Sequence, residues 1–234
     1  MSDTDEGSEL PPTPLDSLGI MASQQAMLND HLRHIEMYTK RGLLSLLWHE
    51  PHGVARPIGV VMLGGAMGGL MGPGDSLYHA LAEELVGRGV PSIRLSYRTA
   101  NDMDSCCMDA AAAIQMLVAS GADNVVVMGH SFGGAVAIRV GVGLNQMVAG
   151  VVTFATQSAG CEVAGGLQGT PLLMFHGDQD SILPLEASEV VRAIAGYGDL
   201  QVMVGDGHLL TNSHDVMYET VLNWIEQLNS GEAA

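Results

Sequence analysis

The chain has 234 residues, of which 47 % are hydrophobic and only 15 % are charged. This length allows one α/β domain with a full core, and the composition excludes a disordered chain. The net charge of −17 leaves no basic stripe to neutralise phosphates, which argues against a nucleic-acid partner.

The N-terminal region, residues 1–26, begins with an acidic, proline-containing stretch and shows no sustained hydrophobic periodicity. We expect a flexible arm there, with a short helix near 23–32 as an option, followed by a single domain over 27–234. The arm lacks the basic and then apolar order of a signal peptide, and no apolar run reaches the roughly 18 residues that span a bilayer. The sequence therefore predicts a cytoplasmic protein without a membrane span.

Strand and helix patterns alternate along the rest of the chain. Residues 34–39 and 43–49 flank a Lys-Arg-Gly turn and predict an antiparallel hairpin. The apolar patterns predict further strands at 58–63, 91–97, 124–128, 147–154, 172–175 and 200–204, and helices at 76–87, 104–120, 132–142, 185–195 and 211–228. Strands separated by helices indicate an α/β fold with a mostly parallel sheet that is covered on both faces.

The strongest local signal is Gly-His-Ser-Phe-Gly-Gly at residues 129–134, which fits the G-x-S-x-G motif. It directly follows the predicted strand 124–128 and precedes the predicted helix 132–142. The serine therefore falls on a sharp strand-to-helix turn, where the flanking glycines avoid collisions. Such a turn places the Ser131 hydroxyl at the carboxyl end of the sheet, so we predict Ser131 as a nucleophile.

A nucleophilic serine needs a base and a carboxylate that orients the base, in the chain order Ser, Asp, His. The loop after the strand 172–175 carries Asp178 and Asp180, and we prefer Asp180 because Asp178 follows a glycine in a tight turn. The glycine-rich loop after the last strand carries His208, which we prefer to His214 because a loop at a strand's end reaches the nucleophile more easily.

A glycine-rich loop, LGGAMGGLMGPGDS, follows the first buried strand. It has neither the G-x-G-x-x-G register nor the Gly-Lys-Ser/Thr of phosphate-binding loops. We expect the backbone amide of Ala66, or alternatively that of Met67, to pair with the amide of Phe132 and hold a developing oxyanion. Residues 156–170 are too few for a cap domain, which predicts an open substrate pocket. The expected apolar lining residues are Met67, Leu70 and Leu183.

The remaining cysteines and histidines suggest no second chemistry. Cys106, Cys107 and Cys161 form an odd set with one adjacent pair, which is not a disulfide framework, and neither Cys106 nor Cys107 lies on a glycine-flanked turn suited to a nucleophile. No H-x-x-x-H, C-x-x-C or clustered carboxylate spacing is present, so we predict neither a metal nor a cofactor. His31, His34, His79 and His130 receive no catalytic role.

The order of LGGAMGG, LSYR, GHSFGG, HGDQDSILP and GDGH resembles the α/β-hydrolase superfamily, nearest to its capless dienelactone-hydrolase-like and small-esterase branch, over about residues 34–228. The resemblance implies an eight-stranded sheet and the triad Ser131, Asp180 and His208. Two departures stand out. Dienelactone hydrolases proper carry a cysteine nucleophile, and Gly64 stands where many relatives have the histidine of a His-Gly pair.

These features predict a hydrolase that cleaves carboxylic esters of small to medium acyl groups through an acyl-enzyme on Ser131. The partner is then a small-molecule ester, while the oligomeric state is left open. The same triad serves thioesters, amides and peptides, because nothing in it selects the leaving group. An alternative from another class is a non-catalytic scaffold that uses the same fold for binding.

Overall fold

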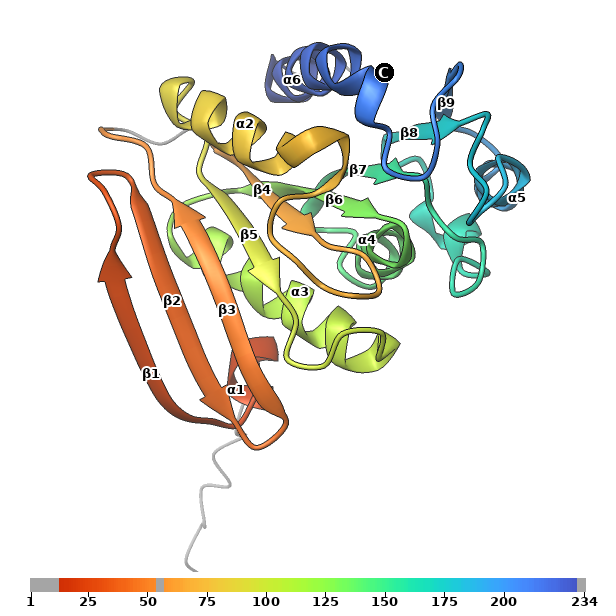
Figure 1. Cartoon of the computed structure of the whole chain (residues 1–234). Coiled ribbons are helices and arrows are strands. Elements are labelled where there is room, and N and C mark those ends of the chain that lie inside the picture. The colour runs from red at the N-terminus through yellow and green to blue at the C-terminus, as the bar shows by residue number, and fades with distance from the viewer. Residues whose placement is uncertain (1–12, 54–56, 231–234) are drawn as a thin grey trace, which may run out of the picture.

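The computed structural model describes residues 13–53 and 57–230 (Figure 1). These residues form a nine-stranded sheet with helices packed against it. Its spatial order is β1-β2-β3-β5-β4-β6-β7-β8-β9. The strands are β1 (Ile20–Met27), β2 (Leu32–Thr39), β3 (Gly42–His49), β4 (Ile58–Leu63), β5 (Ser92–Ser96), β6 (Asn124–His130), β7 (Val148–Phe154), β8 (Leu172–Gly177) and β9 (Asp199–Met203). The strands β4 to β9 pair in parallel, whereas β1, β2, β3 and β5 pair antiparallel in that order.

Helices cover both faces of this sheet (Figure 1). They are α1 (Pro14–Ser17), α2 (Pro73–Gly87), α3 (Met103–Ala119), α4 (Phe132–Gly143), α5 (Glu186–Ala195) and α6 (His214–Ser230), with short 3₁₀ turns η1 (Ala164–Leu167) and η2 (Thr211–Ser213). Neighbouring residues of β4 point to opposite faces, so that Val60 packs with α2 and α6 while Val61 packs with α3 and α4. Because helices cover both faces of the sheet, every residue of β4 is buried.

The predicted hairpin and the other predicted strands and helices are confirmed, with ends that differ by about three residues or fewer. Two expectations are wrong. The sheet has nine strands instead of eight, and the helix near 23–32 does not form, because residues 20–27 are the edge strand β1. Residues 14–26 are therefore not a structureless arm, whereas residues 1–12 lie outside the described residues.

The strand β1 was not predicted because of the way in which it is held in the sheet. All eight of its residues are exposed, so the strand buries no alternating apolar face that a sequence pattern could reveal. It is held instead by backbone pairing with β2, in a register that places Gln24 opposite Glu36. In the part of the chain that the structure describes, no helix is long and apolar enough to cross a membrane.

Candidate active site

Ser131 occupies the turn between β6 and α4 with φ 56° and ψ −117°, a conformation that costs energy for a residue with a side chain. Its amide donates to the carbonyl of Phe154 at 2.8 Å, which ties the turn to the next strand. A Cβ on Gly129 would lie 1.9 Å from the carbonyl oxygen of Gly133, and one on Gly133 would lie 2.3 Å from that of Gly64. The turn therefore requires glycine on both sides of the serine.

Asp180 and His208 meet across the loops that follow β8 and β9. Asp180 Oδ2 lies 2.7 Å from His208 Nδ1. A Cβ on Gly177 would lie 2.2 Å from the carbonyl oxygen of Asp206, so a glycine at the end of β8 is what allows the two loops to approach. Because a carboxylate accepts, Nδ1 carries the imidazole proton, and the other ring nitrogen of His208 is left able to accept one.

The carboxylate of Asp180 is fully buried and well satisfied. Its Oδ1 accepts the amides of Ile182 at 2.8 Å and Leu183 at 2.9 Å, and His176 Nε2 lies 3.3 Å from Oδ2. Burial acts to raise the pKa of Asp180, but the hydrogen bonds from these amides and from His208 outweigh it and lower the pKa. Asp180 is therefore ionised at neutral pH and holds the His208 ring in one tautomer.

The alternatives to this pair, Asp178 and His214, make other contacts, as does the neighbouring Asp206. Asp178 accepts the amide of Gly205 at 2.6 Å, and Asp206 accepts the amide that follows it at 3.2 Å. His214 lies at the start of α6, where its Nδ1 donates to the carbonyl oxygen of Gly74. Each of the three is thus engaged with backbone, and the structure brings together the acid and the base that the sequence analysis preferred.

Residues 78–208, more than half of the chain, match the protein family described as "Dienelactone hydrolase family". The chain belongs to this family. The matched span contains Ser131, Asp180 and His208, and membership supports hydrolase activity. A comparison with curated protein sequences found no match.

Solved structures show that this dienelactone hydrolase family member has the α/β-hydrolase fold. Est1E from Butyrivibrio proteoclasticus matches with a TM-score of 0.71 at 15 % identity, over 84 % of this chain and 99 % of that one. A Coxiella burnetii alpha-beta serine hydrolase homologue has a TM-score of 0.64 at 21 % identity, over 86 % and 99 %. XC6422 from Xanthomonas campestris, described as a serine hydrolase without lid, has 0.63 at 16 %, over 85 % and 97 %. In this chain, too, only a loop with η1 separates β7 from β8.

His130, to which the sequence analysis assigned no role, contacts the loop of His208. Its Nε2 lies 3.0 Å from the carbonyl oxygen of His208, and the two ring centroids are 4.9 Å apart. Burial lowers the pKa of His130 to about 4, although the hydrogen bond to the His208 carbonyl acts to raise it, so the ring is neutral and donates from Nε2. The residue next to Ser131 therefore anchors His208, a role indicated in the sequence only by its adjacency to the serine.

Burial of a neutral His130 makes the stability of this family member depend on pH. The pKa of His130 is about 4 in the folded chain, below the value of about 6.5 in an unfolded chain, so the unfolded state takes up the proton first as the pH falls. Stability is thus lost between about pH 6.5 and 4. Urea unfolding measures the stability lost between pH 7 and pH 5. We expect this loss to be about 2 kcal/mol smaller in His130→Gln than in the unmodified protein.

The control for this measurement is His79→Gln, which removes an exposed histidine from α2. It should leave the loss of stability between the two pH values as it is in the unmodified protein. An equal loss in His130→Gln and in the unmodified protein would contradict the buried, neutral state of His130.

The loop 64–72 places backbone amides beside the nucleophile. A Cβ on Gly65 would lie 3.6 Å from the Cβ of Ser131, and the amide of Gly68 donates to the carbonyl oxygen of Gly65 at 2.8 Å, which closes a tight turn. Within residues 13–53 and 57–230, the amides of Ala66 and Phe132 make no hydrogen bond to the protein. Both amides are therefore available as donors to a bound group.

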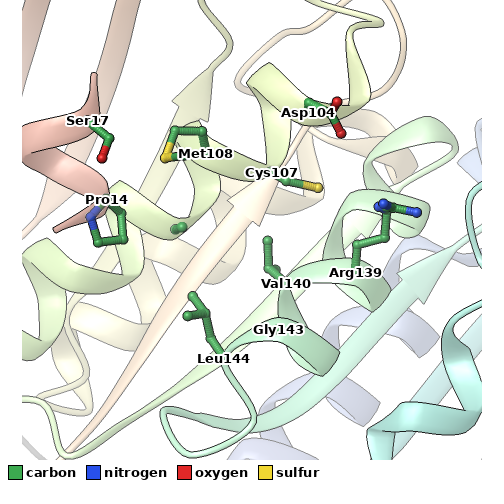
Figure 2. Close-up of a pocket in the computed structure, with 10 residues that line it drawn as sticks. Pro14, Ser17, Asp104, Cys107, Met108, Arg139, Val140, Gly143 and Leu144 are labelled. Carbon is green, nitrogen blue, oxygen red and sulfur yellow. The ribbon is translucent and has the colours of Figure 1, made fainter. Parts of the chain in front are cut away.

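The side chains predicted to line the pocket differ in exposure. Met67, at the tip of the loop, is 95 % exposed, whereas Leu70 and Leu183 are half-buried. A separate pocket of about 490 Å³ opens between α1, α3 and α4, lined by residues that include Cys107, Met108 and Leu144 (Figure 2). It contains none of the predicted site residues, so its apolar wall belongs to a different region of the surface.

Proposed function

We propose that the protein is a serine hydrolase that cleaves carboxylic esters of small to medium acyl groups. The observation that carries the proposal is the 2.7 Å contact between Asp180 and His208, made beside the strained turn that presents Ser131. The contact between His130 and His208 supports it, because it links the loop of the base to the residue that precedes the nucleophile.

In the proposed reaction, the Ser131 hydroxyl attacks the acyl carbonyl while His208 Nε2 takes its proton. Asp180 stabilises the imidazolium that results. The tetrahedral oxyanion accepts hydrogen bonds from the amides of Phe132 and Ala66, at the N-terminus of α4 and in the loop 64–72. The intermediate then expels the alcohol, which takes the proton from His208, and water releases the acyl group by the same steps.

The short connection between β7 and β8 supports this substrate class. Only a short loop with η1 connects β7 to β8, which favours accessible esters over substrates that a cap must enclose. A structural neighbour, Est1E from Butyrivibrio proteoclasticus, has been solved with ferulic acid bound. Esters of aromatic acids therefore belong in a substrate panel beside acetyl to dodecanoyl esters, and a thioester tests the main alternative leaving group.

Labelling with a fluorophosphonate tests the proposal directly. The reagent phosphonylates a serine that an adjacent base activates, so we expect one adduct per chain, located on Ser131 by peptide mass spectrometry. Ser131→Ala should remain unlabelled. Absence of label in the unmodified protein, or an adduct that survives in Ser131→Ala, would contradict the assignment and favour a scaffold without catalysis.

A further inference from the structure

Arg94 is a buried cation that touches the end of the loop 64–72. It lies on β5 with only 2 % of its surface exposed. Its Nη1 donates to the carbonyl oxygen of Leu70 at 3.3 Å and lies 3.6 Å from the sulfur of Met71. Burying a guanidinium costs free energy unless its N–H groups are hydrogen-bonded. These contacts, together with those to His49, therefore fix the position of the end of the loop.

The other donors of Arg94 contact His49, which ends β3 and is fully buried. Nε and Nη2 of Arg94 lie 3.2 and 3.0 Å from His49 Nε2. The two side chains share a face of the sheet, because His49 pairs with Ser92 and Leu47 with Arg94. Burial, followed by the charge of Arg94, lowers the pKa of His49 to about 4, so the ring is neutral.

A series of polar contacts continues from His49 to α2, although the His49–Glu83 contact does not meet the geometry of a hydrogen bond. A guanidinium can only donate, so His49 Nε2 accepts and its Nδ1 carries the ring proton, 3.4 Å from Glu83 Oε1. The second oxygen of Glu83 lies 3.0 Å from His31 Nε2. The order Arg94, His49, Glu83, His31 joins strand β5, strand β3, helix α2 and the turn before β2, and it holds the guanidinium in place.

The same three side chains, His31, His49 and Glu83, bring ligand atoms within 4.8 Å of one another, which is close enough to share a metal ion. Two features argue for polar contacts that support Arg94 instead of a metal site. The nitrogen of His49 that faces Glu83 carries a proton, and a metal-ligating imidazole normally donates its other nitrogen to an acceptor, whereas here that nitrogen accepts from a cation. His31, His49 and Glu83 therefore act to hold the Arg94 guanidinium in place.

The beginning of the loop is held by two buried phenols. Tyr78 donates to the carbonyl oxygen of Leu63 at 3.0 Å, and Tyr97 donates to that of Gly64 at 3.2 Å. Arg94 holds the far end at Leu70 and Met71. The amide of Ala66 lies between these two anchor points, so its direction depends on both of them.

We propose that Arg94 is a positioning residue that holds the loop 64–72, and through it the amide of Ala66, in the geometry that binds the oxyanion. The inference rests on the proposed function. An oxyanion donor acts on the transition state much more than on the bound substrate, and losing one costs about 10²- to 10³-fold in kcat. Loosening its loop should cost less, by about 10- to 100-fold, with KM within about two-fold of its original value.

The test compares Arg94→Met and Arg94→Lys with Arg88→Met, a matched change at the partly exposed end of α2. Fluorophosphonate titration counts the active molecules, so that kcat is expressed per active site and a partly unfolded sample does not imitate the effect. We expect Arg94→Met to show the loss in kcat and weaker inhibition by a trifluoromethyl ketone, which mimics the tetrahedral anion. Arg94→Lys should recover part of the loss with its single donor nitrogen, and Arg88→Met should match the unmodified protein.

Two outcomes would overturn the inference about Arg94. A kcat per active site that is unchanged in both Arg94 variants overturns the inference, as does a rise in KM without a fall in kcat. If Arg94→Met does not fold, Arg94→Lys carries the test, because it keeps the buried charge and removes the planar fork. Failure of the unmodified protein to label at Ser131 overturns the proposed function itself, which separates the two failures.

Discussion

From the proposed function we expect Ser131→Ala to lower kcat for a p-nitrophenyl ester by about 10⁴-fold or more, the loss that follows removal of a triad nucleophile. The Asp180–His208 pair remains, but it has no hydroxyl from which to take a proton. The residual rate comes from binding and from the oxyanion amides alone. Stopped assays at high enzyme concentration measure this rate, and circular dichroism checks that the variant is folded.

Ser120→Ala provides the control for the nucleophile. This exposed serine lies at the C-terminal end of α3, where its hydroxyl donates to the carbonyl oxygen of Leu117. The variant should keep the full rate. If Ser131→Ala hydrolyses the ester as fast as the control does, the observed hydrolysis does not use Ser131, and the proposed function fails.

We expect Gly129→Ala to lower the free energy of unfolding by about 3 kcal/mol or more, because the added methyl group would lie 1.9 Å from the carbonyl oxygen of Gly133. Both contacting groups belong to the backbone, so no side-chain rotation relieves the clash. The turn must open, and Ser131 then leaves its position. Urea unfolding gives the loss of stability, and fluorophosphonate labelling of the folded fraction gives the loss of reactivity.

Gly143→Ala makes the same chemical change at the end of α4, where a new Cβ meets no atom within 4 Å. An alanine in a helix is favoured over glycine by roughly 0.5–1 kcal/mol, so this variant should be as stable as the unmodified protein or slightly more stable. Equal stability of the two alanine variants would show that the turn at Ser131 tolerates a side chain at position 129.

The local parts of the site were predictable because neighbouring residues determine them. The turn at Ser131 needs a strand, a pair of glycines and a helix, and all of these lie within residues 124–143. The parallel strands were equally predictable, since strands that are buried on both faces have continuous apolar sequences such as Ile58–Leu63. The edge strand β1 escaped prediction because it buries no side chain and depends on β2 for its hydrogen bonds.

The choice between candidate acids and bases required the folded chain. Asp178, Asp180, His208 and His214 all follow plausible strands, and the sequence ranks them only by loop position. The tertiary structure brings Asp180 to 2.7 Å from His208, across 28 residues of chain, and turns His214 toward the backbone of α2. It also places His130 against His208 and Arg94 against His49 and the loop 64–72. Periodicity and motifs report the forces between neighbours in the chain, whereas these contacts depend on how strands and loops far apart in sequence come to lie at one edge of the sheet.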